Sequence, residues 1–387
     1  MAFQMQAIAK TDQELAAWLR LAITPGLRPA ALRRLLADFG LPDAVLGQPF
    51  EALARSTDAI TAHAVLSAPG TQFNAHLEAL LAWRSAPGNA VLALDDPAYP
   101  PMLLTMPDPP PLLYVKGQLA ALHRRSVAIV GSRSATPQGI EDAGRFARTL
   151  SDAGVCVVSG LALGIDAAAH RGALSSPGGT VAVVGTGVDI VYPTVHRALS
   201  QQIAGAGALL SEWPLGTPAR AAHFPQRNRL IAGLVGGVLI VEAAMRSGSL
   251  ITARLANEMG RDVYALPGSI HAPLSRGCHR IIKQGAKLVE TPEEVLEELG
   301  INAGANTAAS RPSSNPTALA GAPPAALTPE ARHLLDALGH SPAALEILAA
   351  RTEMPQTELQ ATLLQLELAG HLVVLPGGRY VRASPSP

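Results

Sequence analysis

Residues Val127-Ala128-Ile129-Val130-Gly131-Ser132-Arg133 decide the fold, because a short apolar run ends there at a glycine turn. Further apolar runs follow it, separated by stretches with helical periodicity. Strands of near-continuous apolarity that alternate with helices are buried on both faces, as in a doubly wound, mostly parallel sheet. We therefore predict a central Rossmann-like α/β domain over 122–300. Its further strands are expected at 155–159, 181–184, 208–211, 238–241, 263–266 and 287–289.

Two segments precede this domain. Residues 1–85 carry helical patterns over 14–23 and 29–39, joined by a Thr24–Leu27 turn, which predicts a small helical domain of the helix-hairpin-helix kind. Residues 86–121 are rich in proline and aspartate, so we expect an extended connecting arm there.

The C-terminal part divides into a linker and a third domain. Residues 301–327, rich in Ala, Ser, Pro and Gly, predict a flexible linker. Residues 328–387 predict a winged-helix domain, with helices over 328–338, 342–350 and 355–369 followed by a hairpin. The helix over 355–369 has no lysine or arginine, which disfavours insertion into a DNA groove and favours protein contact or regulation.

Charge is distributed unevenly along the 387 residues. The net charge is zero, yet residues 121–289 hold 17 Lys+Arg and 9 Asp+Glu, and residues 290–300 hold five Glu and no base. The basic middle predicts a polyanionic partner. Apolar runs are too short for a membrane span, no secretory signal is evident, and the two cysteines, Cys156 and Cys278, have no metal-ligand spacing. We expect a cytoplasmic protein with no metal and no membrane contact.

Glycine and serine turns follow several predicted strands. They are Gly131-Ser132-Arg133, the stretch 159–166 with Gly160 and Gly164, Gly185-Thr186-Gly187, and Ser247-Gly248-Ser249. The carboxyl ends of parallel strands meet at one edge, where glycines allow close backbone approach and free amides donate to anions. Each turn alone is equally compatible with an ordinary strand-to-helix connection. Together they predict an anion-binding edge.

Basic residues accompany these turns. Phe224-Pro225-Gln226-Arg227-Asn228-Arg229 is the densest basic element of the middle domain, and arginine suits bidentate phosphate contact. Aromatic residues are scarce, and Phe224 and Tyr192 are the candidates for base stacking.

Several catalytic sites are disfavoured. The dinucleotide fingerprint lacks its third glycine after Gly187, and there is no Walker loop, so no cofactor is expected. Asp166 and His170 stand four apart and could form a metal or acid–base pair, although a capping aspartate and a packed histidine are favoured. No dense carboxylate set and no nucleophile elbow occurs, so the chain is not expected to be an enzyme.

Taken in order, these motifs resemble the DprA/Smf family of DNA-processing proteins over essentially the whole chain. The motifs that carry the resemblance are residues 130–133, 159–170, 185–187 with 192–193, 224–233, 242 with 247–253, and 260–268. The resemblance implies a non-catalytic, homodimeric protein that coats single-stranded DNA and loads the recombinase RecA during natural transformation. It also implies an N-terminal domain similar to a sterile-alpha-motif fold, and it places a DNA contact on Arg133.

Two positions depart from the pattern that the resemblance implies. Thr194 stands where many members have lysine after the Tyr-Pro pair, so part of the DNA contact is expected to move to Arg197. The Gly277-Cys278-His279 turn also differs from the common Gly-Thr-Asn. The full set of expected DNA-binding residues is Gly131, Ser132, Arg133, Gly160, Gly164, His170, Arg197, Phe224, Arg227, Asn228, Arg229, Ser247, Gly248, Ser249 and Lys283.

One enzymatic alternative remains open. Lysine-decarboxylase-like nucleotide phosphoribohydrolases combine a similar sheet with a glutamate near the fifth strand, a role that Glu242 would take here. Their Pro-Gly-Gly-x-Gly-Thr turn is absent from this sequence.

Overall fold

The central sheet has strands in the order β1-β2-β6-β5-β4-β3-β7-β8-β9 in a computed structural model that describes residues 10–301, 328–338, 342–375 and 377–383. The strands from β6 to β9 run parallel to one another, which confirms the predicted mostly parallel α/β fold. Their bounds are β3 Ser126–Val130, β4 Cys156–Ser159, β5 Thr180–Val183, β6 Ala208–Ser211, β7 Gly237–Ile240, β8 Asp262–Ala265 and β9 Lys287–Leu288.

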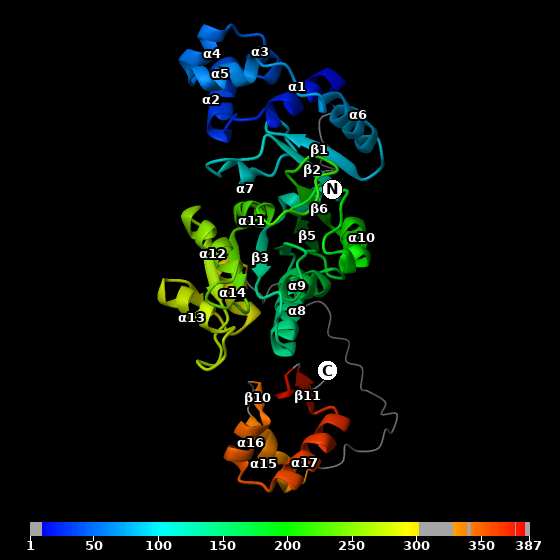
Figure 1. Cartoon of the computed structure of the whole chain (residues 1–387), viewed down its shortest axis with the longest axis vertical. Coiled ribbons are helices and arrows are strands. Elements are labelled where there is room, and N and C mark those ends of the chain that lie inside the picture. Colours follow the sequence, from blue (N-terminus) through cyan, green and yellow to red (C-terminus); the bar gives the residue numbers. More distant parts are fainter. Residues whose placement is uncertain (1–9, 302–327, 339–341, 376, 384–387) are drawn as a thin grey trace.

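Helices cover both faces of this sheet (Figure 1). One face carries α11 (His223–Leu234), α12 (Ser249–Glu258) and α13 (Arg276–Lys283). The other carries α8 (Pro137–Asp152), α9 (Ile165–Ala173), α10 (Arg197–Ala206) and α14 (Pro292–Glu298). Alternation along β3 explains the two layers, because Val127 and Ile129 face α8 while Ala128 and Val130 face α11.

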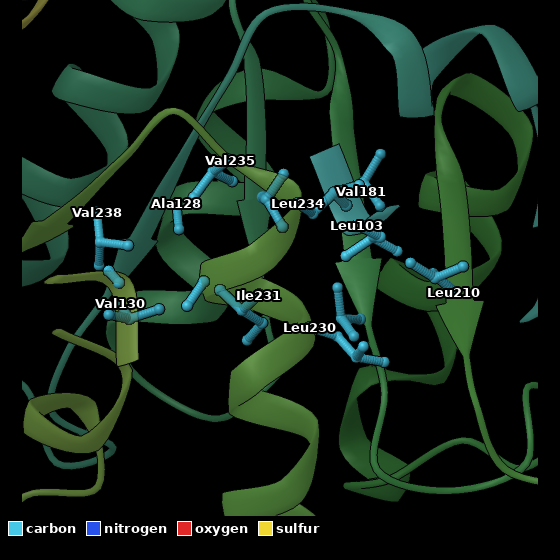
Figure 2. Close-up of a cluster of buried hydrophobic side chains, with 14 of the residues drawn as sticks. Leu103, Ala128, Val130, Val181, Leu210, Leu230, Ile231, Leu234, Val235 and Val238 are labelled. Carbon is cyan, nitrogen blue, oxygen red and sulfur yellow. The ribbon is translucent and has the colours of Figure 1, made fainter. Parts of the chain in front are cut away.

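Leucine and isoleucine side chains of α11 fix this helix in one of the cores. Leu230, Ile231 and Leu234 pack on the sheet beside Val181 and Leu210, as Figure 2 shows. All of these side chains are at most 2% exposed. Because α11 is fixed along its length by this packing, the residues of its first turn have a defined place at the carboxyl edge of the sheet.

The segment predicted as a connecting arm contains two strands of the sheet, which corrects that expectation. β1 (Asn89–Ala93) and β2 (Leu112–Gly117) pair antiparallel, and β2 pairs antiparallel with β6. The prolines lie between the two strands, around the short helix α7 (Pro101–Leu104). The 3₁₀ helix η1 (Leu119–His123) follows β2. β1 is the edge strand and β2 is paired on both sides, and neither contains a proline that would interrupt its pairing.

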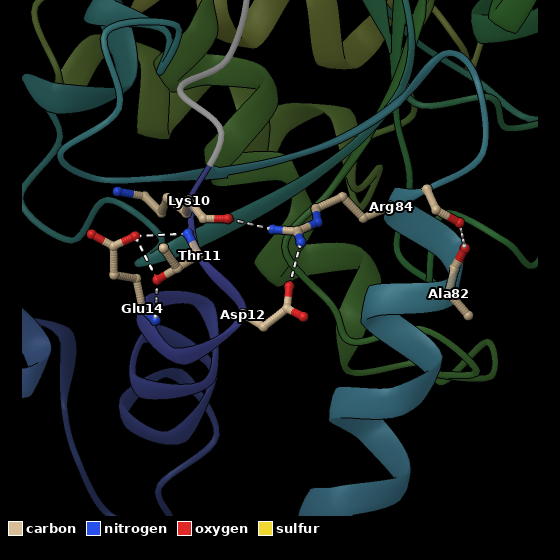
Figure 3. A network of polar contacts seen from close by, with 7 residues as sticks. Lys10, Thr11, Asp12, Glu14, Ala82 and Arg84 are labelled. Carbon is tan, nitrogen blue, oxygen red and sulfur yellow. Dashed lines mark hydrogen bonds and ion pairs between the residues drawn. The ribbon is translucent and has the colours of Figure 1, made fainter.

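The N-terminal helices pack partly on this edge and partly on each other. Their bounds are α1 Asp12–Ala22, α2 Pro29–Phe39, α3 Pro42–Leu46, α4 Phe50–Ser56, α5 Ala59–Leu66 and α6 Phe73–Arg84. Trp18 and Leu80 share a core with Tyr114 of β2. Thr11 and Glu14 form a capping box on α1, while Arg84 of α6 donates to Asp12 at 2.7 Å (Figure 3).

The C-terminal domain has the predicted winged-helix order. It contains α15 (Pro329–Leu338), α16 (Leu345–Thr352), α17 (Gln356–Leu368) and a three-stranded sheet of β10 (Ala343–Ala344), β12 (Arg379–Arg382) and β11 (Leu372–Leu375). Thr328 caps α15 as expected, since its hydroxyl accepts from the Ala331 amide at 3.2 Å. Residues 302–327 of the predicted linker lie outside the described residues.

Close backbone approach joins α8 to α9, the two helices that follow the Gly131 and Gly160 turns. A Cβ on Gly172 of α9 would lie 2.3 Å from the Gly144 carbonyl oxygen of α8. A Cβ on Gly144 would meet nothing nearer than the Ala168 oxygen, at 3.9 Å. The close packing of α8 on α9 therefore requires glycine at position 172 and does not require it at position 144.

We predict that Gly172→Ala lowers the free energy of unfolding by about 1–3 kcal/mol, because the added methyl must separate the two helices. Gly144→Ala is the matched control and is expected to leave stability unchanged or raise it by about 0.5–1 kcal/mol through helix propensity. Urea unfolding monitored by circular dichroism measures both. Equal effects of the two substitutions would contradict this packing.

Candidate nucleic-acid interface

Arg227 points into the domain from the first half of α11. The residue is 4% exposed, and its Nη1 donates to the Gly160 carbonyl at 2.5 Å and to the Val183 carbonyl at 2.6 Å. Burial lowers the pKa of Arg227 to about 10, so it stays cationic at neutral pH. The prediction that Arg227 contacts phosphate is therefore wrong. The side chain instead ties α11 to the carboxyl ends of β4 and β5.

Gly160 is required by this arginine. A Cβ at position 160 would lie 1.9 Å from Arg227 Nη1, a distance that no real side chain could adopt. The glycine thus makes room for a guanidinium of the protein, whereas the sequence analysis expected it to make room for phosphate.

The backbone amides of the 160–166 turn are also used internally. The Gly160 and Ala162 amides donate to the Asp166 carboxylate at 3.1 and 3.3 Å, and the Leu161 amide donates to His170 Nε2 at 3.3 Å. Burial raises the pKa of the Asp166 carboxyl, while the charge of Arg227 acts in the opposite direction. An anion would have to displace these bonds, so the amides of Gly160, Leu161 and Ala162 are not free.

His170 is part of the same buried network. It is 0% exposed, and its Nδ1 lies 2.7 Å from Thr180 Oγ1. Burial lowers the pKa of His170 to about 3, so the ring is neutral at physiological pH. This burial leaves His170 no surface for the predicted DNA contact and confirms the favoured assignment of a packed histidine. Asp166 lies in the first turn of α9, but its side chain caps no amide of that helix and accepts instead from amides of the preceding turn.

Gly131, Ser132 and Gly164 form a tightly packed junction between two turns. A Cβ on Gly131 would lie 2.6 Å from Ile165 Cγ1, and a Cβ on Gly164 would lie 2.3 Å from the Ser132 oxygen. The Ile165 amide donates to that same oxygen at 3.2 Å, and Ser132 is 8% exposed. These residues hold the chain before Arg133 in place and offer little surface of their own.

Arg133 projects outward from this junction, at the point where the order of connections reverses between β3 and β7. Its Cζ lies 5.3 Å from the centroid of the Phe224 ring, and the Tyr192 ring centroid lies 5.5 Å from that of Phe224. Both spacings suit aromatic and cation–π contact. Tyr192 is 47% exposed. We call these three residues the edge cluster.

The edge cluster combines two properties that single-stranded nucleic acid requires. No ion pair engages Arg133 in the part of the chain that the structure describes, so its charge is available to a phosphate. The rings of Phe224 and Tyr192 can stack on bases whatever their sequence.

Arg229 differs from Arg133 because it is already paired. It forms ion pairs with Glu212 and Asp108, and its side chain is 17% exposed. Burial raises the pKa of Glu212 even beside this cation. The phosphate contact of Arg229 stays a prediction, since its guanidinium already neutralises two carboxylates, which follow β6 and precede β2.

The remaining candidates lie around the edge or outside it. Asn228 Nδ2 donates to the Gly248 carbonyl at 3.3 Å, which brings α11 and the 247–249 turn together. In that turn Ser247 Oγ lies 2.7 Å from Ser249 Oγ. Arg197 is exposed at the start of α10, and Lys283 is exposed at the end of α13, with no described contact to the edge cluster.

Glu242 follows β7 and is held by the start of α8. Its two carboxylate oxygens accept from the Thr136 amide at 2.9 Å and the Thr136 hydroxyl at 2.6 Å. The same hydroxyl accepts from the Gly139 amide at 3.0 Å. Burial raises the pKa of Glu242. The carboxylate thus secures a helix N-terminus that stabilises negative charge.

Two exposed apolar residues beside the edge cluster escaped the sequence analysis. Leu163 is 45% exposed in the turn after β4, and Met245 is 46% exposed in the turn after β7. Leu163 directly precedes Gly164, and Met245 lies two residues before the Ser247-Gly248-Ser249 turn. These exposed residues could have been predicted from the sequence, because each is a large apolar residue in a turn whose other residues are mostly small or polar. Among the described residues no group of three or more His, Cys, Asp or Glu could hold a metal ion.

We predict that Arg227→Met lowers the free energy of unfolding at pH 7 by about 3–5 kcal/mol, because it leaves Asp166 buried without its cation. A carboxyl with a raised folded pKa loses stability as pH rises, so the deficit should shrink toward acidic pH, where Asp166 binds a proton. Arg133→Ala is the control and should change stability by less than about 0.5 kcal/mol. Urea unfolding of both variants, measured at several values between roughly pH 5 and pH 8, tests the size of the loss and its dependence on pH. A deficit that is independent of pH would contradict the charge pairing.

The sequence matches two protein-family models and several known proteins. Residues 90–300 match the family model described as DNA recombination-mediator protein A, and residues 318–378 match that of the DprA winged helix domain. Protein Smf of Escherichia coli (strain K12) is 43% identical over 307 residues, covering 79% of this chain and 80% of that protein. DNA processing protein DprA of Streptococcus pneumoniae is 48% identical over 205 residues, covering 53% and 72%.

Two solved structures are similar to this one. The X-ray structure of DprA from Streptococcus pneumoniae superposes with a TM-score of 0.64 at 36% identity and covers 75% of this chain and 98% of that chain. DNA processing protein A from Helicobacter pylori, whose structure is described in terms of its single-stranded DNA binding mode, gives a TM-score of 0.50 at 30% identity, with 55% and 95% covered. The fold, the winged-helix domain and the extent of the match together show that this chain belongs to the DprA/Smf family of DNA processing proteins.

Proposed function

We propose that this protein binds single-stranded DNA along the carboxyl edge of its central sheet, protects it, and loads RecA onto it during natural transformation. The observation that carries the proposal is the edge cluster, in which the unpaired Arg133 guanidinium lies 5.3 Å from the Phe224 ring centroid, with Tyr192 beside it. The Helicobacter pylori relative, described by its single-stranded DNA binding mode, supports the same class of ligand.

Side chains provide most of the contact in this proposal. The amides of the 160–162 turn already donate to Asp166 and His170, so they contribute little to phosphate binding. The exposed Arg133 and Arg197 supply charge, and the exposed Leu163 and Met245 supply apolar surface for bases. Duplex DNA hides its base faces, so an edge built from rings and arginines favours single strands.

The protein acts in this proposal without chemistry of its own and in the cytoplasm. A nucleotide phosphoribohydrolase would need Glu242 to be free for substrate, yet both of its oxygens accept hydrogen bonds from Thr136. Release of free base from nucleoside monophosphates, abolished by Glu242→Gln, would favour the enzyme instead. No helix within the described ranges is long and apolar enough to cross a membrane.

The protein is proposed to act as a homodimer. The edge strand β9 supports this, because both of its residues are exposed and Leu288 is 48% exposed. Exposed edge strands with apolar residues readily pair with another chain. The winged-helix domain is proposed to contact a protein such as RecA, since α17 carries no basic residue and exposes Leu364 at 56% and Leu368 at 81%.

We predict that Arg133→Ala weakens binding of a thymidine oligonucleotide about tenfold at moderate salt, since it removes one charge-assisted phosphate contact. The slope of log K against log salt should also fall by about 0.7. Phe224→Ala should weaken binding by about 1–3 kcal/mol, through loss of stacking and of the contact to Arg133. Mobility shifts on single-stranded and duplex DNA across a salt series measure these effects.

Arg148→Ala is the matched control for this experiment. Arg148 is equally exposed on α8 but lies near the opposite end of that helix from the Arg133 turn. Its removal should lower affinity less than Arg133→Ala does. If both substitutions have the same effect, or if wild type binds single-stranded and duplex DNA equally, the edge cluster is not the binding site.

The proposed dimer is tested separately. Leu288→Glu places a charge on the exposed edge strand and should shift the protein toward monomer in sedimentation equilibrium. Exposed Leu104, on α7 and 44% exposed, provides the control substitution Leu104→Glu. A wild-type protein that remains monomeric at micromolar concentration would contradict the homodimer.

A further inference from the structure

A cavity lies on the face of the sheet that α10 covers, lined by residues on both sides of Tyr192 in sequence. Its volume is about 630 Å³, within the range of roughly 300–1,000 Å³ that small-molecule sites occupy. Residues 188–191 and Thr194 form one wall, α10 forms another, and Lys116 of β2 and Leu209 of β6 close the base. Lys116 and Leu209 are register partners across the antiparallel pair.

The cavity is lined by two cationic side chains that lack a partner among the described residues. Lys116 and Arg197 both line it and both are exposed, and neither side chain has an ion pair or hydrogen bond described in the structured part of the chain. Asp189 lines it too, but its carboxylate accepts from the Gly216 amide at 3.1 and 3.0 Å. The Asp189 carboxylate pairs with neither cation. Two unpaired cations in one cavity are suited to binding an anionic group of a ligand.

The walls offer the other contacts that a nucleotide needs. Val191 provides partly exposed aliphatic surface, while Leu209 is 3% exposed and Ser200 is 3% exposed with no described partner for its hydroxyl. The loop wall is fixed, because Thr186 donates to the Ile190 carbonyl at 2.7 Å and His196 Nδ1 lies 2.9 Å from the Leu161 carbonyl. The cavity therefore does not depend on a rearrangement to form.

Its position connects it to the edge cluster. Val191 and Thr194 line the cavity, and Tyr192 between them contacts Phe224 on the other side of the same loop. A strand stacked on Tyr192 would pass directly from the edge cluster to the mouth of the cavity, where Arg197 begins α10. This chain has Thr194 at the mouth, a small residue that leaves the entrance open.

We propose that this cavity, which we call the Lys116 pocket, binds a nucleotide. Its phosphate lies between Lys116 and Arg197, its base packs on Val191, and Asp189 accepts a hydrogen bond from a base amino group or sugar hydroxyl. The nucleotide is either one unit of the bound strand or a free mononucleotide. The first source rests on the proposed DNA binding, and the second does not.

Two substitutions remove the pocket in different ways. Lys116→Ala deletes one cation, and Ala204→Phe fills the cavity from α10. Gln202→Phe is the matched control, because Gln202 is exposed on the same helix and does not line the cavity. Thermal unfolding is measured for each variant, and only variants that remain folded are used. This separates a loss of binding from a loss of structure.

Two probes distinguish the sources. Thymidine monophosphate is titrated by calorimetry, and a thymidine oligonucleotide carrying one 4-thiothymidine, placed in turn at each end and in the middle, is photo-crosslinked and mapped by mass spectrometry. For a nucleotide of the strand we expect crosslinks to residues 188–204 and about tenfold weaker oligonucleotide binding in Lys116→Ala and Ala204→Phe. For a free nucleotide we expect the same loss on thymidine monophosphate alone.

Gln202→Phe should match wild type on both probes. If Lys116→Ala and Ala204→Phe bind both ligands as wild type does, and no crosslink falls in 188–204, the Lys116 pocket is overturned. Failure of wild type to bind the oligonucleotide would overturn the proposed function, and the thymidine monophosphate titration would then decide the pocket by itself.

Discussion

The buried guanidinium of Arg227 is the constraint on which the interface depends. It donates to carbonyls at the ends of two neighbouring strands, Gly160 after β4 and Val183 in β5, and its charge acts on the buried carboxyl of Asp166. A charge in a protein interior is tolerated only with such partners. Because Phe224 begins the same helix one turn earlier, the anchoring of Arg227 also fixes the ring that contacts Arg133.

The distribution of cations therefore has two parts. Some arginines of the basic middle segment hold the fold together: Arg227 and Arg229 do so at the edge, Arg124 donates to the carbonyls of Pro177 and Gly178, and Arg261 donates to Met102. Others, Arg133 and Arg197 among them, remain exposed. A count of charge along the sequence overstates the number of phosphate ligands, although every cation contributes to the long-range field that attracts a polyanion.

Much of the fold could be predicted because it depends on local patterns. Apolar β-branched runs identify the parallel strands, and helix capping with a hairpin identifies the winged-helix domain. The strands β1 and β2 could not be found in this way, because prolines occupy the segment between them and because β2 is held by pairing with β6, which is distant in sequence. The edge itself was predictable from the rule that ligands bind where parallel strands end.

The roles of individual residues at that edge were harder to assign, because a buried and an exposed arginine look alike in a motif. One signal was available for Arg227. It lies on the stripe of α11 formed with Leu230, Ile231 and Leu234, spaced three, four and seven residues on, which is the buried face of the helix. His170 likewise lies on the buried face of α9, four residues after Asp166. Arg133 is in a turn and on no such stripe.

Hydrogen–deuterium exchange with and without a thymidine oligonucleotide tests the central claim most directly. We expect protection in peptides covering residues 131–136, 190–197 and 223–228, and unchanged exchange in α17 and along α11 beyond Arg227, whose amides are already held by helix and core. Protection confined to the winged-helix domain, or spread evenly over the chain, would contradict an interface built on this edge.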